Sequence, residues 1–169
     1  YLGMINKDKG FLEISKCLIK LLKNKINISF LIVGPEEDST LIESKKLFKK
    51  HRNNLKIISF THTPEKYFQA ADIFCTLSNK EGFGNSVIEA GACGLPAIGS
   101  DIYGLRDSII HNETGYLVNK ENSVEIEYFF NKLASNDDLI TRLGNNARLR
   151  SKNLFDQNKI TQEFMNILN

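Results

Sequence analysis

Short, almost entirely apolar runs alternate with amphipathic helical stretches, and this alternation constrains the fold of the chain more than any other feature. The run at 28–33 is rich in β-branched residues and stops at Gly34-Pro35. Runs at 55–60, 72–77 and 96–99 have the same character and are bounded by turn residues. Strands that are apolar throughout are typical of parallel sheets covered on both faces. We therefore expect an α/β fold with a Rossmann-like open parallel sheet.

Helical periodicity fills the intervals between these runs. Phe11, Ile14 and Leu18, for example, share one face of a helix expected at 10–24. Each interval is long enough for the right-handed crossover that connects parallel strands. A last short strand is expected at 116–118, followed by a purely helical C-terminal tail with Asn136 or Ser135 as the cap of its second helix. The further helices are expected near 37–51, 67–71, 87–92, 122–135, 137–152 and 156–168.

The composition excludes several classes of protein. The 169 residues are 41% hydrophobic and 25% charged, which is typical of a globular domain. The 22 basic and 20 acidic residues give a net charge of +2, so we expect no nucleic-acid partner. Cys17, Cys75 and Cys93 lie in no metal-binding or paired spacing and fit apolar fillers in a reducing cytosol. With no run long enough to cross a bilayer, we expect a cytoplasmic protein.

The first residues have the character of the end of a core strand. Tyr1-Leu-Gly-Met4 is apolar, with no residues ahead of it to begin the strand. No internal repeat or long linker divides the rest of the chain. We therefore interpret residues 1–169 as a single domain and as a fragment of a longer protein.

Ligands of open α/β sheets bind beyond the carboxyl ends of the strands, so the turns there are the places to search for a site. The richest is the loop at 78–86, in which Gly82 and Gly84 flank Phe83 just before a helix. Glycines let a ligand approach the backbone, and the free N–H groups of a helix start favour an anion such as phosphate. The loop is not a dinucleotide fingerprint, because Val87 stands where glycine or alanine is needed, and it is not a P-loop.

Two carboxylates frame this loop. Glu81 precedes it and can accept hydrogen bonds from a hydroxylated ligand, while Glu89, one helical turn further on, can bind a ribose diol. Each has a structural alternative that the local pattern leaves open. Ser86 and Glu89 have the spacing of a capping box, which would direct Glu89 to backbone donors. Glu81 can equally be a solvated loop carboxylate, and the main expected role of Phe83 is to anchor the loop.

Several strings together resemble the donor-side domain of retaining family 4 glycosyltransferases with the GT-B fold, the glycosyl transferases group 1. The resemblance implies the C-terminal, donor-binding half of a two-domain enzyme, whose N-terminal acceptor domain is not in this sequence. It covers nearly the whole chain. The strings that carry it are Ala71–Ser78, Glu81–Ala90, Ala92–Pro96, Gly3 with Lys9-Gly10, Leu31–Gly34 and Glu113–Val118.

The resemblance also implies roles for individual residues. Glu81 would be the catalytic carboxylate that holds hydroxyls of the transferred sugar, and the backbone amides of Phe83 and Gly84 would seat the sugar and diphosphate. Glu89 would bind the ribose and Lys9 the diphosphate. Further implied contacts are those of Gly82, Asn85 and Ser86 with the donor, and of Gly34, Thr61 and His62 with the nucleotide base.

The chemistry of the leaving group agrees with these roles. Departure of a nucleoside diphosphate develops negative charge, which a lysine and a helix N-terminus stabilise without a metal ion. No Asp-x-Asp pair occurs in the chain, so we expect neither a metal nor a cofactor. Without the resemblance, Lys9 would be interpreted as an exposed turn lysine. Where the family commonly has an arginine as a second phosphate ligand, this chain has Met4, which predicts a weaker grip on the diphosphate unless Lys7 substitutes.

By resemblance, the complete enzyme transfers a hexose-type sugar from a UDP- or GDP-linked donor to a glycan or lipid-linked acceptor. Bacterial surface polysaccharide synthesis is the expected setting, at the inner face of the membrane, with peripheral membrane association of the full-length enzyme as an option. Two alternatives stay open: a nucleotide-sugar epimerase of GT-B architecture, and a non-catalytic nucleotide-binding domain, which Met4 favours. The isolated chain is expected to bind nucleotide weakly and to transfer nothing.

Overall fold

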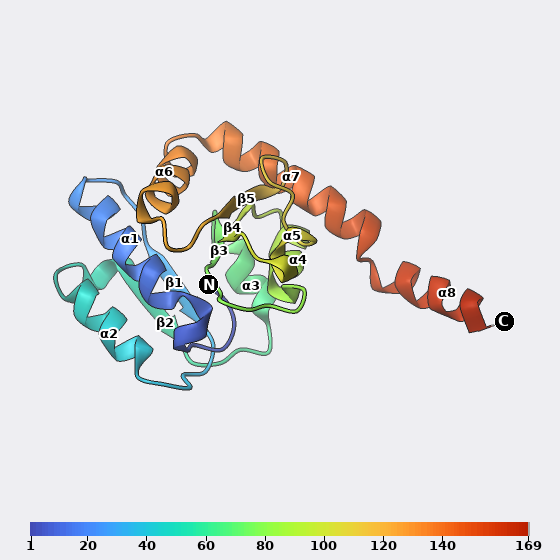
Figure 1. Cartoon of the computed structure of the whole chain (residues 1–169), viewed down its shortest axis with the longest axis horizontal. Coiled ribbons are helices and arrows are strands. Elements are labelled where there is room, and N and C mark those ends of the chain that lie inside the picture. Colours follow the sequence, from blue (N-terminus) through green and yellow to red (C-terminus); the bar gives the residue numbers. More distant parts are fainter. Residues whose placement is uncertain (169) are drawn as a thin grey trace.

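The strands are all parallel, as the apolar runs predict, and the computed structural model describes them within residues 1–168 (Figure 1). They are hydrogen-bonded in two groups. One sheet pairs β1 (Phe30–Val33) with β2 (Leu55–Ile58). The other has the order β3 (Phe74–Thr76), β4 (Ala97–Ser100) and β5 (Gly115–Val118). The α/β class with parallel strands is therefore confirmed, but β1 and β3 are not joined in one continuous ladder.

Helices follow and cover the strands. Helix α1 packs on α2 and α6, and α4 packs on α7. The α-helices are α1 (Phe11–Lys23), α2 (Thr40–Leu47), α3 (Pro64–Gln69), α4 (Asn85–Ala92), α5 (Tyr103–Arg106), α6 (Ser123–Ala134), α7 (Asp137–Leu154) and α8 (Gln157–Leu168). Short 3-10 turns lie at η1 (Lys7–Lys9), η2 (Phe48–Lys50) and η3 (Arg52–Asn54).

Most expected elements lie within a few residues of their predicted positions. Asn136 is the cap of α7, and its side chain accepts a hydrogen bond from the Leu139 N–H. The helix expected at 37–51 is shorter, because α2 gives way to η2 at Phe48. Helix α5 was not predicted, since four residues are too few to show helical periodicity.

The start of the chain runs parallel to β1. The Val33 N–H donates to the Tyr1 carbonyl at 3.1 Å, and the Gly3 N–H donates to the Val33 carbonyl at 2.9 Å. This pairing agrees with the strand-end character of residues 1–4. Gly34 fits closely against it, because an added Cβ would lie 1.8 Å from the Gly3 carbonyl oxygen.

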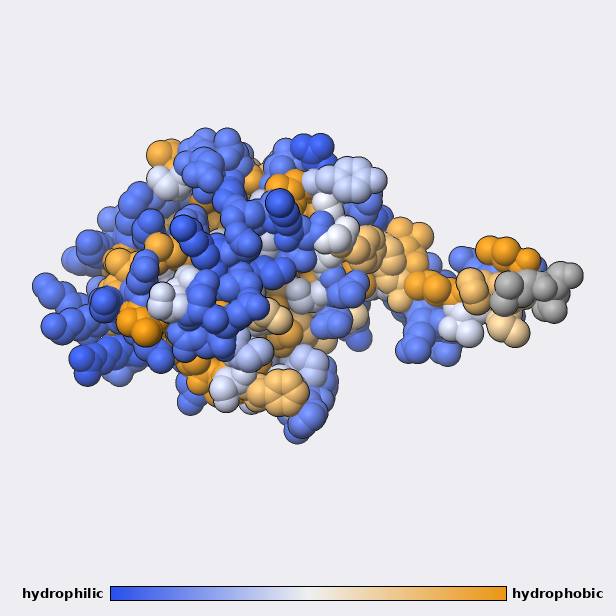
Figure 2. Space-filling view, turned by 60° about the horizontal axis from the view of Figure 1, so that its bottom comes forward, coloured by the Kyte–Doolittle hydropathy of each residue, from blue (hydrophilic) through white to orange (hydrophobic). Residues whose placement is uncertain are grey.

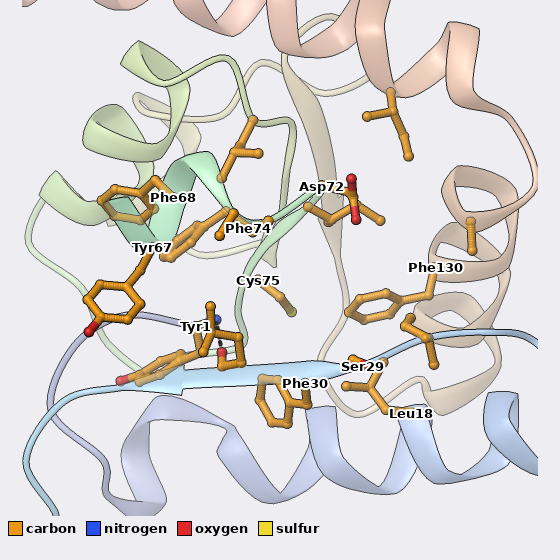
Figure 3. A pocket seen from close by; sticks show the side chains of 18 of the residues that line it. Tyr1, Leu18, Ser29, Phe30, Tyr67, Phe68, Asp72, Phe74, Cys75 and Phe130 are labelled. Carbon is orange, nitrogen blue, oxygen red and sulfur yellow. Dashed lines mark hydrogen bonds between the residues drawn. The ribbon is translucent and has the colours of Figure 1, made fainter. Parts of the chain in front are cut away.

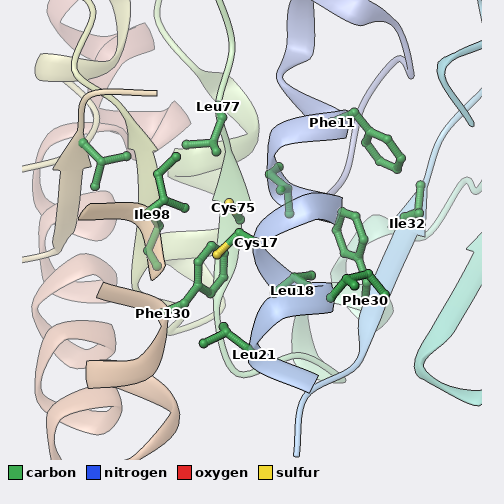
Figure 4. Close-up of a cluster of buried hydrophobic side chains, with 14 of the residues drawn as sticks. Phe11, Cys17, Leu18, Leu21, Phe30, Ile32, Cys75, Leu77, Ile98 and Phe130 are labelled. Carbon is green, nitrogen blue, oxygen red and sulfur yellow. The ribbon is translucent and has the colours of Figure 1, made fainter. Parts of the chain in front are cut away.

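The largest apolar cluster lies between α1 and the two sheets (Figure 4). The rings of Phe11 and Phe30 stack in it at 5.2 Å. Cys17 and Cys75 are buried there as fillers, and burial raises the pKa of the Cys17 thiol to about 12. A second cluster, which includes Phe68, lies between α3, α4 and α5.

The C-terminal helix α8 extends away from the body of the molecule (Figure 1). Ile160 and Phe164 of this helix are exposed, and Figure 2 shows apolar surface along the extension. Among the helices that the structure describes, none combines the length and the hydropathy that a membrane span requires.

Candidate functional site

Lys9 and Glu81, which are 72 residues apart in the sequence, meet at the carboxyl ends of the strands. Lys9 ends η1, just before α1, and Glu81 lies in the loop that follows β3. The Lys9 Nζ is 2.6 Å from the Glu81 Oε1, and the two side chains are 25% and 21% exposed. The structure therefore brings the predicted phosphate-binding lysine and the predicted catalytic carboxylate into one ion pair that remains open to solvent.

The turn that carries Lys9 is held against the end of β3. The Asn79 N–H donates to the Asp8 carbonyl at 2.6 Å, and the Asn79 side-chain amide donates to the Asp8 carboxylate at 3.0 Å. Gly10 has φ 63°, and a Cβ there would lie 1.9 Å from the Leu77 carbonyl oxygen. Only glycine tolerates both the left-handed conformation and this close approach. The position of Lys9 beside the loop is thus built into the backbone.

Buried hydroxyl groups orient the Glu81 carboxylate. The Ser78 hydroxyl donates to the same Glu81 Oε1 at 2.9 Å, and Thr76 Oγ1 lies 3.0 Å from Ser78 Oγ. The Ser100 hydroxyl donates to the Ser78 carbonyl at 2.8 Å. Thr76, Ser78 and Ser100 are all buried. Sequence reasoning assigned them no role, although hydroxyl residues at the ends of apolar strands were the available signal.

Helix α4 begins differently from the capping-box interpretation. Its cap is Gly84, with φ 76°, and no side chain caps it. The Gly84 carbonyl accepts the Val87 N–H at 2.8 Å. Ser86 already lies inside the first turn, so it does not form the capping box with Glu89, and that alternative is wrong. The N–H groups of Asn85 and Ser86 belong to the first turn, where a helix has no acceptors of its own, and they donate to no acceptor among the described residues.

Glu89 is consequently not engaged in capping. It lies in the fifth position of α4, and its carboxylate has no hydrogen-bond partner among the described side chains and backbone groups. Partial desolvation raises the pKa of this carboxyl. An exposed acceptor one turn inside the helix is compatible with a bound ribose, and that role remains a prediction.

Phe83 and Gly104 fix the loop from outside. The Phe83 ring packs edge-on against Phe155, at the end of α7, with 5.3 Å between the ring centroids. This contact supports the interpretation of Phe83 as an anchor. Gly104 in α5 lies against the loop backbone, and a Cβ there would be 1.8 Å from the Glu81 carbonyl oxygen. Gly82, in contrast, is exposed, with no atom within 4 Å of an added Cβ.

The residues expected at the nucleotide base form no hydrogen bond or ion pair with Lys9 or Glu81 in the described part of the chain. Thr61 Oγ1 accepts the N–H of Thr63 at 3.0 Å, and the His62 ring packs edge-on against the exposed Phe60. Gly34 directly follows β1 and packs on the start of the chain. No hydrogen bond or ion pair between described residues connects these three positions with Lys9 or Glu81, and their role toward a base remains a prediction.

The position of the missing family arginine is occupied by a half-exposed apolar side chain. Met4 is 47% exposed. Lys7 is exposed as well, and its backbone N–H donates to the Asp38 carboxylate at 2.9 Å. The Lys7 ammonium forms no ion pair with another residue of the described part of the chain. Its role as a second phosphate-binding cation remains a prediction.

Comparison with protein families agrees with this arrangement. The family model of glycosyl transferases group 1 matches residues 1–150. The chain belongs to this family. The capsular polysaccharide biosynthesis glycosyltransferase CapM of Staphylococcus aureus is 30% identical over 170 residues, which cover 100% of this chain and 45% of CapM. A poly(ribitol-phosphate) alpha-N-acetylglucosaminyltransferase of S. aureus is 27% identical and is covered over 32% of its length. The chain thus spans less than half the length of these two relatives.

Solved structures place the chain in the C-terminal domain of such proteins. The C-terminal domain of the group 1 glycosyltransferase LpcC from Francisella tularensis is 25% identical, with a TM-score of 0.79, over 92% of this chain and 85% of LpcC. A mutant of S. aureus TarM, in complex with fondaparinux, alpha-GlcNAc-glycerol and UDP, is also 25% identical, with a TM-score of 0.85, over 99% of this chain and 35% of TarM. The fold is one half of the GT-B architecture.

Proposed function

We propose that residues 1–169 form one Rossmann-like domain that binds the nucleotide-sugar donor of a retaining glycosyltransferase. The complete enzyme transfers a hexose-type sugar from a UDP- or GDP-sugar to a glycan or lipid-linked acceptor, in bacterial surface polysaccharide synthesis. The contact between Lys9 and Glu81, beside the first turn of α4, carries this proposal. The names of the two S. aureus relatives, which refer to capsular polysaccharide and to poly(ribitol-phosphate), support the class of acceptor, and the UDP in the TarM complex supports a uridine nucleotide.

The site separates two kinds of charge. Lys9 and the N–H groups at the start of α4 offer positive charge to the diphosphate, where negative charge develops as the sugar departs. Glu81 offers carboxylate oxygens to the sugar hydroxyls, and Ser78 fixes their direction. The 2.6 Å ion pair keeps both charges compensated, and Lys9 can exchange this carboxylate for phosphate oxygens. No metal ion is needed for this charge balance.

Titration with nucleotides tests the proposal directly. We expect the chain to bind UDP or GDP weakly, and Lys9→Ala to weaken that binding by about tenfold, because a hydrogen-bonded phosphate contact to a charged group is lost. Isothermal titration calorimetry measures the effect. Lys16→Ala, which changes an exposed lysine of α1, is the matched control and should bind like the parent chain.

Two outcomes would contradict the proposal. Binding that is insensitive to Lys9→Ala removes the phosphate role of this lysine. No binding of any nucleotide favours a binding or regulatory domain that keeps the fold without catalysis, an alternative that the exposed Met4 in place of a cation also supports.

Ser78→Ala is expected to affect the sugar and not the nucleotide. Without the Ser78 hydroxyl, the Glu81 carboxylate loses a buried donor that orients it, so binding of a UDP-sugar should weaken by about tenfold while binding of UDP alone stays the same. Competition calorimetry with both ligands separates the two effects. Ser15→Ala removes a buried hydroxyl that bonds to Phe11 and Ser44 and not to the loop, and it controls for lost stability. Equal weakening of both ligands would show that Ser78 acts only on the fold.

A further inference from the structure

The basic residues of this chain are distributed unevenly. Ten of the 22 lysines and arginines lie in two segments, 14–35 and 44–64, that contain no aspartate or glutamate. The rest of the chain therefore has 12 basic and 20 acidic residues. The net charge of +2 is thus the sum of a strongly positive part and a negative remainder.

The two positive segments meet at the amino ends of β1 and β2. The Asn54 side-chain amide donates to the Ile28 carbonyl at 2.9 Å, which joins the turn before β2 to the turn before β1. Helices α1 and α2 lie side by side and both end at this edge (Figure 1). Figure 3 shows, beside the pocket between β1 and β3, that α1 runs antiparallel to β1 and ends on the side of Ser29, which leads into the strand.

The cations that gather at this edge form a basic patch. Each of them is exposed, and none forms an ion pair with another residue in the described part of the chain. Lys20 is not a member, because it pairs with Glu127 of α6. Figure 2 shows a largely hydrophilic surface at this end of the molecule, away from α8. The members of the patch are Lys23, Lys25, Lys45, Lys46, Lys49, Lys50 and Arg52.

Helix stability accounts for only part of this charge. Lysines in the last turn of a helix interact favourably with its dipole, and Lys23 in α1 and Lys45 and Lys46 in α2 have such positions. The other four members lie beyond the last residues of these two helices. Like charges that gather on one surface repel one another and destabilise the folded state. A positive surface that the fold does not need indicates a negatively charged partner.

Two apolar side chains among these cations distinguish between negative partners. Ile42 is 51% exposed and Leu47 is 36% exposed. Ile42 lies one turn before Lys45 and Lys46 in α2, so the three side chains are neighbours on the helix surface. A soluble polyanion attracts lysines by charge and offers no apolar phase. A bilayer with anionic lipids attracts lysines and also takes apolar side chains into its interface.

We propose that the basic patch docks this domain on a membrane surface that contains anionic lipids. The patch and the donor site lie at opposite ends of α1, because Lys9 comes just before its start and Lys23 is its last residue. The 13 residues of this helix span about 20 Å. Docking through the patch therefore leaves Glu81 and the glycine-rich loop uncovered, and the proposal does not depend on which donor the site binds.

Cosedimentation with lipid vesicles tests the proposal. The chain should bind vesicles of phosphatidylcholine with about one third phosphatidylglycerol, and not vesicles of phosphatidylcholine alone. Sodium chloride at about 0.5 M should release it, because salt screens exposed charges. Replacing Lys45, Lys46, Lys49 and Lys50 together with alanine should weaken binding by about 100-fold, since each basic residue near the surface contributes. The absence of any preference for the anionic vesicles would overturn the proposal.

A variant with the same net charge is the matched control. Alanine at Lys66, Arg148, Lys152 and Lys159 removes four exposed cations outside the patch. Its binding to the anionic vesicles should stay within about twofold of the parent chain, because charges farther than a Debye length from the lipid are screened. Equal losses in the two fourfold variants would mean that net charge attracts the chain without a defined surface, which contradicts docking through the patch.

Ile42→Ser separates a bilayer from a soluble polyanion, because it removes apolar surface and no charge. Binding to the anionic vesicles should weaken by about fivefold, since less apolar surface enters the interface. Binding to heparin, a soluble polyanion, should not change. If heparin binds the parent chain and Ile42→Ser binds the vesicles like the parent, the partner is a soluble polyanion and the proposal is wrong.

Discussion

Replacing Glu81 with glutamine in the full-length enzyme is expected to lower sugar transfer by about 100-fold or more, the usual scale for removing one preorganised electrostatic group from an active site. The amide loses the negative charge and one acceptor, so the 2.6 Å ion pair with Lys9 is reduced to a hydrogen bond to a neutral oxygen. Binding of UDP should persist or tighten, because Lys9 no longer shares its charge with a carboxylate. Initial rates with a UDP-sugar, together with the Kd of UDP, measure both effects.

Glu43→Gln provides the matched control. Glu43 is an exposed carboxylate of α2, and its replacement changes the net charge by the same amount without touching the loop. Transfer at the parent rate by the Glu81 variant would refute the catalytic role. A parallel loss of UDP binding and of folded protein would mean that the ion pair acts on stability alone.

Replacing Gly104 with alanine is expected to destabilise the fold by about 1–3 kcal/mol, as overpacking commonly does, and to reduce donor binding as well. The added Cβ would lie 1.8 Å from the Glu81 carbonyl oxygen, so α5 and the glycine-rich loop must separate. The partner atom is backbone and cannot rotate away. Urea unfolding gives the change in stability. Calorimetry with a UDP-sugar measures the loss of donor affinity that a displaced Glu81 would cause.

Gly82→Ala is the control within the same loop, since nothing lies within 4 Å of an added Cβ and its φ is not left-handed. Its free energy of unfolding should lie within about 0.5 kcal/mol of that of the parent chain, as is usual for surface substitutions. If both glycine variants lose similar stability, the contact between the loop and α5 is not the cause of the loss in Gly104→Ala.

Local sequence patterns predicted some features of the site and missed others. The glycine-rich loop and its two carboxylates are visible in the sequence, because Gly82 and Gly84 flank Phe83 immediately before a helical stripe. The family resemblance, not the spacing, implied that Lys9 and Glu81 act in one site, since 72 residues separate the two, and it did not predict their ion pair. The capping box failed because the sequence motif does not reveal where α4 begins: Gly84 takes the left-handed cap position instead.

The sequence by itself determined the order of strands and helices, their parallel direction and the position of the loop, because apolar periodicity and turn residues act over a few neighbouring positions. Only the tertiary structure decided that Ser78 and Ser100 hold the loop carboxylate and that Gly104 presses on it. These contacts join residues from different strands and helices, and they depend on how the elements pack. The pocket between β1 and β3 is also a property of packing, since it appears only when two strands far apart in the sequence face each other across it.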